Sequence, residues 1–381
     1  VTYKGNLPSK TIYNIIPVRQ GKRKKSPEHQ DQNACYYPFI LRKLPEHGNA
    51  SMYVCGSIPQ IGNWDMSQAV PMDEEVRNEE NFYTKYIKIH PIQFPFEYKY
   101  FYVKDDEINW VGMAYDNFQV SPQIYDITKN IKKKEISVLE LNVRYLNNVD
   151  GVNIWENRRN ELVNLVLNSH ADIVFYQEIT KIQYNFIDKY LSSIYEFIGV
   201  YRDSTNASEK CSICYNIVKY TLIDWGQFWL SSTPEIPGSN DFKNFFPRIC
   251  TWCVLKQVNG DTLLFMNIHL DHVNMEAHMP CIQVAIAEGE KLIDKFPEIK
   301  FVFMGGCFYC EEYDPIISYI KRKGFIEVYF ENTYHKFTGI ANNHWDYMFW
   351  MERGGNNEFM LKESHVLKKE ATIDQSCNRY I

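Results

Sequence analysis

The character of the sequence changes abruptly near residue 130, and this change limits the possible folds more than any other feature of the 381-residue chain. Before it, over about 35–125, short Tyr- and Val-rich segments are separated by Pro, Gly and Asn, which predicts a small all-β domain. Residues 126–135 are charged and lack periodicity, so we expect a linker there. After it, apolar strand-like segments alternate with amphipathic helical ones such as 155–168 and 279–296. We therefore predict a second, layered α/β domain over 136–381, with helices flanking sheets.

Composition and charge exclude several classes of protein. Hydrophobic residues make up 45% of the chain and charged residues 23%, which is ordinary globular usage and excludes general disorder. We expect residues 1–34, with the basic run 22–25, to form a solvated polar arm. The net charge of −6 gives no positive field over the whole protein, so nucleic acid is not an expected partner. Because no long apolar run or leader-like start is visible, we expect no membrane span and favour the cytoplasm slightly over secretion.

Candidate sugar-binding residues gather around two tryptophans in the first domain. Trp64 lies in a Gly- and Pro-containing turn after a strand-like segment, and Trp110 follows a second one. Such turns expose a ring on a rigid base, and the face of a Trp stacks on the apolar C–H face of a sugar. Lysine, asparagine and carboxylate side chains nearby, among them Lys99 and Asn117, would bind the hydroxyl groups. The alternative is that both tryptophans are core residues.

The order of these residues resembles the starch-binding modules of carbohydrate-binding family twenty. The resemblance is carried by Gly56–Asp65, by Phe96–Lys99, and by Trp110 followed by Asn117. It covers about 35–125 and implies a β-sandwich in which Trp64, Lys99 and Trp110 form the main α-glucan site. Val111 departs from the family, since an acidic residue usually follows the second tryptophan.

Polar residues also stand at predicted strand ends in the second domain. They are Asn142, Glu178, His269 and Asp346. A carboxylate and an amide at adjacent strand ends supply the oxygen ligands that Mg²⁺ prefers. A nearby histidine could protonate a leaving group or stabilise a phosphoryl oxygen. The group therefore indicates metal-assisted phosphoester hydrolysis, whereas each residue taken singly could be a cap or a structural side chain.

The second half carries further motifs in a fixed order. They are Asn142–Tyr145, Asp150–Arg159, Gln177–Glu178, Phe228–Ser231, Thr233–Glu235, Pro237–Ser239, Pro247–Trp252, Asn267–His272 and Asp346–Tyr347. This series resembles the endonuclease/exonuclease/phosphatase superfamily, which has the deoxyribonuclease I-like fold, and it runs from about 136 to the end. The resemblance implies a four-layer, two-sheet α/β sandwich with a pocket at one edge. It also implies that Asn142 and Glu178 lie at a Mg²⁺ ion. His269 would act on the scissile phosphate, and Asp346 would support the phosphate or the histidine.

One motif of that superfamily is broken. Where its members have Gly-Asp-Phe-Asn, this chain has Gly305-Gly306-Cys307-Phe308, so Gly306 replaces the aspartate and Phe308 the asparagine. Glycine can neither accept a proton nor bind a metal, and phenylalanine offers no donor to an oxyanion. Loss of one oxyanion donor alone costs about 10²–10³ in rate. Acidic residues that could substitute stand several positions further on, at Glu311, Glu312 and Asp314.

Two other features bear on the chemistry. The Ser-Asp-His that closes the superfamily's sequence is not found after Asn378–Ile381, so we expect either a natively missing last strand or a trimmed chain. Three Cys-x-x-Cys pairs begin at Cys211, Cys250 and Cys307. Their separation is longer than in zinc sites, and residues i and i+3 of a strand face opposite sides, so we do not expect a zinc site.

The leading hypothesis is therefore a catalytically inactive phosphoesterase-fold protein with a carbohydrate-binding module, acting as a glucan-binding or protein-interaction scaffold. The alternative is an active Mg²⁺-dependent phosphodiesterase or phosphatase directed to a polysaccharide. The substrate, the protein partner and the oligomeric state stay open.

Overall fold

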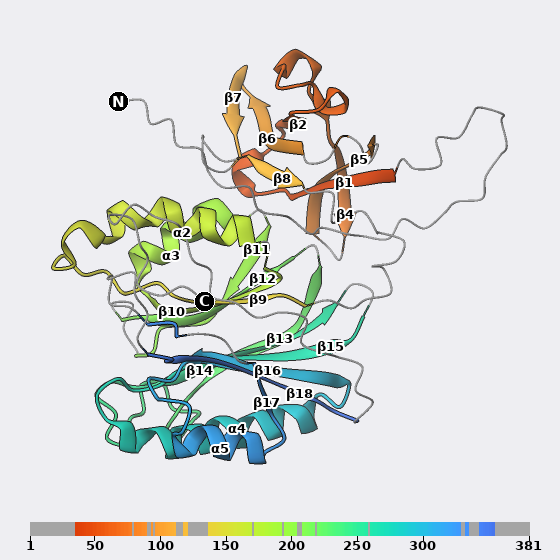
Figure 1. Cartoon of the computed structure of the whole chain (residues 1–381). Helices are drawn as coiled ribbons and strands as arrows, with labels where there is room; N and C mark the ends of the chain where they lie inside the picture. The colour runs from red at the N-terminus through yellow and green to blue at the C-terminus, as the bar shows by residue number, and fades with distance from the viewer. Residues whose placement is uncertain are drawn as a thin grey trace. The chain divides into compact units, whose positions relative to one another are not determined.

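The computed structural model describes residues 35–354, apart from short gaps, and the predicted arm 1–34 and the predicted linker 126–135 lie outside the described residues. The gaps are 78–79, 90–92, 94–95, 112–116, 121–135, 170, 193, 204–207, 218, 258–259, 329–331 and 335–342. The chain separates into two compact units (Figure 1). The first contains Val1–Ser137 with the segments Val163–Ala171 and Lys189–Tyr195, and the second contains Val138–Leu162, Asp172–Asp188 and Glu196–Ile381.

The N-terminal domain is built from antiparallel strands in two sheets. One sheet has the order β1 (Cys35–Arg42), β5 (Glu80–Ile89), β4 (Asp73–Arg77). The other has the order β3 (Val70–Pro71), β2 (Ser51–Gly56), β6 (Phe96–Lys104), β7 (Glu107–Trp110), and β8 (Phe118–Val120) pairs with β6. Short 3₁₀ helices lie between strands, η1 (Pro45–His47), η2 (Pro59–Ile61) and η3 (Met66–Gln68). The prediction of an all-β fold is confirmed.

Alternation along β6 separates the core of this domain from its outer face. Phe96, Tyr98 and Tyr100 are buried in a cluster with apolar side chains of β1 and β2. The ring of Tyr98 meets that of Phe39 edge-on, with centroids 5.0 Å apart. Because side chains of a strand alternate between faces, Lys99 lies on the opposite side of the sheet.

The second unit contains two sheets that pack as a sandwich. The four-stranded sheet has the order β11 (Tyr195–Ile198), β12 (Lys210–Asn216), β10 (Ile173–Ile179), β9 (Val138–Asn142). The six-stranded sheet has the order β13 (Tyr220–Trp229), β14 (Ile249–Gln257), β15 (Thr262–His269), β16 (Ile299–Cys307), β18 (Asp346–Glu352), β17 (Ile326–Val328). The helices are α2 (Trp155–Ser169), α3 (Lys181–Leu191), α4 (His278–Lys295) and α5 (Pro315–Arg322), with 3₁₀ turns η6 (Gly151–Asn153) and η7 (Met275–Ala277).

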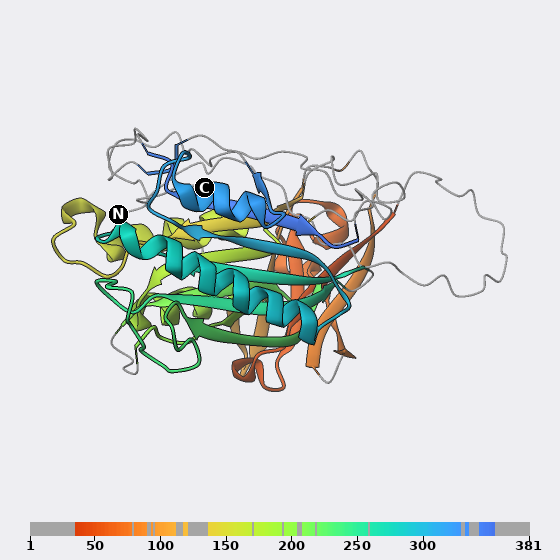
Figure 2. The same cartoon turned by 90° about the horizontal axis from the view of Figure 1, so that it is seen from below.

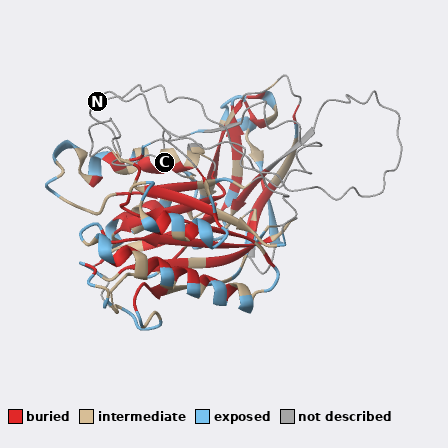
Figure 3. Ribbon diagram, turned by 60° about the horizontal axis from the view of Figure 1, so that its bottom comes forward, coloured by how far each residue is buried: buried red, intermediate tan, exposed pale blue. Residues whose placement is uncertain are grey.

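Helices cover the outer faces of both sheets, which gives the four layers predicted (Figures 1 and 2). Helices α2 and α3 lie over the four-stranded sheet, and α4 and α5 lie over the six-stranded sheet. Between the sheets the rings of Phe175 and Phe303 both pack on Phe265, with centroids 6.4 and 5.1 Å away. Figure 3 shows both sheets coloured as buried along most of their length. None of the helices among the described residues combines the length and apolar character that a bilayer crossing requires.

The strand order brings five strand ends to one edge of the sandwich. Strands β9 and β10 are parallel with Asn142 opposite Gln177, and β15 and β16 are parallel with His269 opposite Cys307. Strand β18 is antiparallel to β16, so Asp346 at its start lies opposite Cys307. Side chains predicted from widely separated parts of the sequence therefore stand at neighbouring strand ends.

Candidate functional site

The turn after β2 presents Trp64 at the surface of the N-terminal domain. The Trp64 side chain is 38% exposed, and its backbone N–H donates to the Gly56 carbonyl at 2.7 Å. Trp64 has φ 66° and the preceding Asn63 has φ 49°, a left-handed conformation that is uncommon for residues other than glycine. Such backbone strain often accompanies a side chain that is held in place for binding.

Trp110 and Lys99 meet on the outer face of the sheet. Trp110 pairs with Phe101 across β6 and β7, and the two rings pack with centroids 5.2 Å apart. Trp110 is 37% exposed, so neither tryptophan is a core residue. The Lys99 ammonium lies 5.6 Å from the centre of the Trp110 ring, within the range of a cation–π contact. Lys99 itself is buried, which means that it backs the ring rather than reaching out from the surface.

Asn117, the fourth predicted sugar-binding residue, has a different partner. Its amide donates to the Glu97 carboxylate at 3.0 Å. Glu97 stands two residues before Lys99 on β6 and so faces the same side of the sheet. A carboxylate–amide pair of this kind offers hydrogen bonds to sugar hydroxyls, and Glu97 adds a residue that was not among the predicted site residues.

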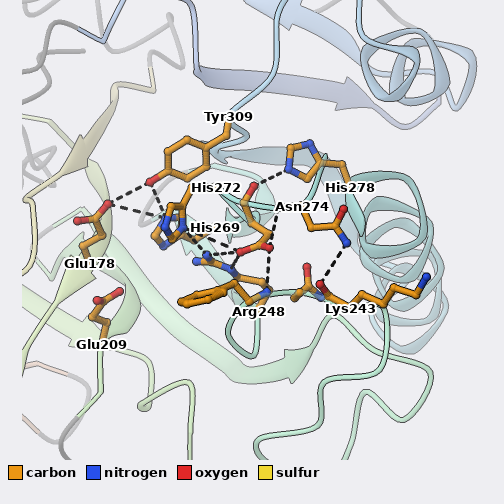
Figure 4. A network of polar contacts seen from close by, with 12 residues as sticks. Glu178, Glu209, Lys243, Arg248, His269, His272, Asn274, His278 and Tyr309 are labelled. Atoms are coloured by element: carbon orange, nitrogen blue, oxygen red, sulfur yellow. Dashed lines mark hydrogen bonds and ion pairs between the residues drawn. The ribbon is translucent and has the colours of Figure 1, made fainter. Parts of the chain in front are cut away.

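The centre of the second cluster is the Glu178 carboxylate at the end of β10 (Figure 4). Its Oε1 accepts hydrogen bonds from the Asn142 amide at 2.7 Å and from the Tyr309 hydroxyl at 3.1 Å. Its Oε2 accepts from the backbone N–H of Tyr145 at 3.0 Å. Glu178 has φ 62°, so its backbone too is left-handed. The predicted proximity of Asn142 and Glu178 is thus present in the structure, but a tyrosine joins them.

His269 stands on the far side of that tyrosine. Its Nε2 lies 3.3 Å from the Tyr309 hydroxyl and 4.0 Å from Glu178 Oε1. The imidazole and the phenol stack with centroids 5.6 Å apart and 26° between their planes. Three residues from strands β10, β15 and the segment after β16 therefore form a chain of polar contacts at one point of the sandwich edge.

The packing at the end of β16 explains why Gly306 and Phe308 stand in the replaced motif. Gly306 has φ 133°, and a Cβ built on it would stand 1.8 Å from the carbonyl oxygen of Ile268 on β15. Phe308 is fully buried in the core under the six-stranded sheet, where its ring stacks near those of Tyr347 and Phe349 at 5.5 and 5.9 Å. An aspartate does not fit at the first position, and the second side chain belongs to the core.

Asp346 and the acidic residues that could substitute for the lost aspartate have other partners. Asp346 is buried and accepts a hydrogen bond from the Thr333 hydroxyl at 2.6 Å. Glu311 accepts from the Asn343 amide at 2.8 Å. Asp314 caps α5 by accepting from the backbone N–H of Ile316 at 3.0 Å. Asp346, Glu311 and Asp314 thus each have a hydrogen-bond partner within the protein.

Glu209 is a second carboxylate of this region that the sequence reasoning missed (Figure 4). Its Oε2 lies 2.8 Å from Nη1 of Arg202, and both side chains are largely buried. Burial, and next the charge of Glu178, raise the pKa of Glu209 to about 7 in spite of that arginine. The available signal was a Glu at the start of the strand-like run 210–216, just ahead of an apolar segment, but such a residue is usually exposed.

The buried Arg248 and Asp271 form a second network with the exposed His272, beside the first (Figure 4). Arg248 Nη2 lies 2.7 Å from Asp271 Oδ1 and 2.9 Å from His272 Nδ1. Burial acts to raise the pKa of Asp271, but the Phe245 N–H and the Arg248 guanidinium outweigh it and hold that pKa below its usual value. Burial, followed by the Arg248 charge, lowers the pKa of His272. Since the guanidinium can only donate, Nδ1 of His272 accepts and its proton is on Nε2.

The side chains at Glu178 do not fit the Mg²⁺ ion that the fold family implies. Magnesium takes oxygen ligands in near-octahedral geometry. Asn142 directs its N–H group at Glu178, because its Oδ1 already accepts from the backbone N–H of Arg144 at 2.9 Å. Tyr309 directs a hydroxyl proton at the same carboxylate. Over the part of the chain that the structure describes, no group of three or more His, Cys, Asp or Glu side chains is arranged to hold a metal ion.

The described cysteines are buried thiols. Burial holds the pKa of Cys211, Cys214, Cys250 and Cys253 well above the usual value, which disfavours the thiolate that a metal would need. No disulfide joins any of the cysteines that the structure describes.

The comparisons with known proteins fall into two groups, one for each domain. Residues 39–129 match the sequence family described as the starch binding domain. An uncharacterized protein of Acanthamoeba polyphaga mimivirus is 29% identical over 174 residues, which are 42% of this chain and 61% of that protein. This chain therefore spans less than two thirds of that relative's length.

Solved structures resemble the second unit. An endonuclease/exonuclease/phosphatase from Bacteroides vulgatus is 24% identical with a TM-score of 0.53, over 57% of this chain and 88% of that one. A family protein of the same description from Bacteroides thetaiotaomicron is 25% identical with a TM-score of 0.53, over 57% and 82%. A mannosyl-6-phosphatase from the latter organism is 22% identical with a TM-score of 0.58, over 65% and 97%.

Fold, clusters and comparisons together define a β-domain that matches a starch-binding family, followed by a domain with a phosphoesterase fold. More narrowly, residues 39–129 match the starch binding domain, and the second domain has the endonuclease/exonuclease/phosphatase, deoxyribonuclease I-like fold. Both resemblances suggested by the sequence are confirmed.

Proposed function

We propose that this chain is an α-glucan-binding protein whose phosphoesterase-fold domain does not hydrolyse phosphoesters and serves as a scaffold for the glucan or for a protein partner. The glucan site is Trp64, Lys99 and Trp110, with the Asn117–Glu97 pair at its side. Two exposed indole rings, one in the turn after β2 and one at the end of β7, support this assignment. The Lys99 ammonium lies against the Trp110 ring and would restrict the orientation of that ring.

The observation that carries the loss of catalysis is the packing of Gly306. The family's aspartate would stand here, and even its Cβ would meet a backbone oxygen of the neighbouring strand at 1.8 Å. Backbone, unlike the end of a flexible side chain, cannot move aside without breaking the pairing of β15 with β16. The pairing of β15 with β16 therefore favours glycine at position 306, and restoring the aspartate would disturb that pairing as well as exchange a side chain.

An active Mg²⁺-dependent phosphodiesterase or phosphatase, directed to a polysaccharide by the first domain, is the second candidate. It is favoured by the convergence of Asn142, Glu178 and His269 at one edge. Glu209, with a pKa of about 7, would add a group able to exchange a proton near neutral pH. This candidate requires Asn142 and Tyr309 to turn away from Glu178 before a cation could bind.

Turnover decides between the two candidates. The purified chain would be incubated with phosphomonoesters, phosphodiesters and phosphorylated α-glucan oligosaccharides in Mg²⁺ or Mn²⁺, and released phosphate or alcohol measured. We expect no turnover above that of Glu178→Ala, which serves as the matched background. A metal-dependent rate that disappears in Glu178→Ala would reject the scaffold proposal and establish the enzyme.

Glucan binding tests the first domain separately. Isothermal titration with a cyclic α-glucan should show binding that falls about two- to twelvefold in Trp64→Ala, since one aromatic stacking contact is worth about 0.5–1.5 kcal/mol. Trp225→Ala is the matched control, because Trp225 is 40% exposed but lies on β13 of the second unit. Equal binding by wild type and Trp64→Ala would remove the glucan from the proposal.

A further inference from the structure

Tyr309 is held firmly in an unfavourable backbone conformation. It follows β16 with φ 51°, and its N–H donates to the Trp345 carbonyl at 3.2 Å, beside the Phe308 N–H, which donates to the same oxygen at 2.7 Å. Its ring is flanked by those of His269, Trp345 and His272, with centroids 5.6, 5.4 and 5.8 Å away. The side chain is 9% exposed, so packing on several sides fixes the hydroxyl in one place.

The Tyr309 hydroxyl lies between Glu178, which the fold family would assign to a cation, and His269, which it would assign to a phosphate. A phenol has one proton to give, and Tyr309 gives it to Glu178 Oε1 at 3.1 Å. The contact with His269 Nε2 at 3.3 Å is then one in which the histidine donates to the phenolic oxygen. Glu178 and His269 are thus linked by a hydroxyl group (Figure 4).

A divalent cation and this hydroxyl group compete for the same atom. A cation needs the lone pairs of Glu178 Oε1 directed at it, whereas here two hydrogen-bond donors, from Asn142 and Tyr309, point at that oxygen. The donors stabilise the negative carboxylate and lower the gain that a cation would bring.

We propose that the Tyr309 hydroxyl replaces a divalent cation as the group that holds Glu178 to His269. The native chain then has no divalent-cation site at Glu178, and removing the Tyr309 side chain creates one in which the Asn142 amide turns its oxygen toward the ion. This inference rests on the proposed loss of catalysis and gives it a local cause that is separate from Gly306. It assigns Tyr309 a positioning role within the site, as an internal substitute for the ion.

The test counts bound Mn²⁺ from the loss of the electron paramagnetic resonance signal of the unbound ion. Tyr309→Gly and Tyr309→Asn are the informative variants, because glycine and asparagine accept a left-handed backbone and both vacate the position of the ring. Tyr313→Ala is the matched control, since Tyr313 lies in the same segment and is exposed. Circular dichroism confirms that each variant is folded.

We expect wild type and Tyr313→Ala to leave millimolar Mn²⁺ unbound. Tyr309→Gly and Tyr309→Asn should each bind one ion, and adding Glu178→Gln to either should abolish that binding. Wild-type binding of Mn²⁺ that is lost in Glu178→Gln would overturn the inference. So would folded Tyr309 variants that bind no ion.

These outcomes separate the inference from the function on which it rests. A wild-type chain that binds Mn²⁺ at Glu178 but hydrolyses nothing defeats the inference alone. Hydrolysis that persists in a chelator, with no cation bound, defeats the proposed function alone. Metal-dependent hydrolysis by the wild type defeats both.

Discussion

Substituting Gly306 by alanine tests directly whether the packing at the end of β16 excludes the aspartate that the superfamily has at this position. The new Cβ would stand 1.8 Å from the Ile268 carbonyl oxygen and 2.8 Å from its carbonyl carbon, at a backbone φ of 133°. Strain at such a φ costs about 1–3 kcal/mol. Overpacking a well-filled interior costs about 1–3 kcal/mol more. We therefore expect the second domain to lose about 2–6 kcal/mol of unfolding free energy.

The matched control is Gly238→Ala, which shares the positive φ but not the contact. Gly238 has φ 80°, and a Cβ there would meet nothing within 4 Å. Its expected cost is the left-handed conformation alone, about 1–2 kcal/mol. The difference between the two variants measures the contact with Ile268.

Urea unfolding followed by tryptophan fluorescence and by circular dichroism would give both values, with the transition of the first domain recorded separately because a two-domain chain need not unfold in one step. Equal destabilisation by Gly306→Ala and Gly238→Ala would refute the packing argument. Gly306→Asp should then also be tolerated, and the loss of the aspartate would be a reversible exchange rather than a fixed feature of β16.

Two further predictions concern buried charges of the second domain. The pKa of Glu209 rises from 4.5 to about 7 on folding, so the folded chain holds that proton more tightly than the unfolded chain does. The unfolding free energy should therefore fall as the pH rises between those two values, by an amount on the order of 3 kcal/mol. Glu209→Gln should remove this pH dependence in thermal unfolding, and parallel curves for variant and wild type would contradict it. Asp271→Ala should cost about 3–5 kcal/mol, because it leaves the buried Arg248 guanidinium without its partner. Lys291→Ala, which breaks an exposed ion pair, is the control and should change the urea midpoint little; an equal effect of both would contradict the assignment.

The sequence allowed the place of the second cluster to be predicted, but not its composition. Asn142, Glu178 and His269 were expected together because each ends an apolar strand, and parallel pairing of β9 with β10 and of β15 with β16 brings those ends to one edge. Tyr309 was not expected there. Its position depends on a φ of 51° and on the carbonyl of Trp345. Neither has a signature in local sequence.

Lys99 illustrates the same limit in the first domain. The resemblance to the starch-binding modules predicted Lys99 as a sugar-binding residue, and the structure places it on the outer face of β6 beside Trp110. Its burial could not be foreseen, because that depends on β7 placing Trp110 beside it through pairing with Phe101. Strand periodicity tells which face a side chain occupies, while the neighbouring strand decides whether the side chain reaches solvent.

Phe308 does not lie where its place in the motif predicts, and the next residue, Tyr309, lies there instead. From its place in the motif, Phe308 was expected to stand at the active edge as a side chain without a donor. The ring instead joins the core beside Tyr347 and Phe349, and the following residue turns to the edge. A large apolar side chain gains most by full burial, and that preference redirects the chain at this point.

Retention of polar residues at the sandwich edge is therefore weak evidence for catalysis. The Glu178 carboxylate, the Asn142 amide and the Tyr309 hydroxyl satisfy one another inside the protein. Removing one partner of such a set leaves a buried polar group unsatisfied at a cost of about 1–3 kcal/mol, whether or not the set performs chemistry. Selection for stability alone would keep Glu178 and Asn142. Gly306 and Phe308 are the informative positions, because they replace the aspartate and asparagine of the superfamily's motif and both are parts of the packed fold.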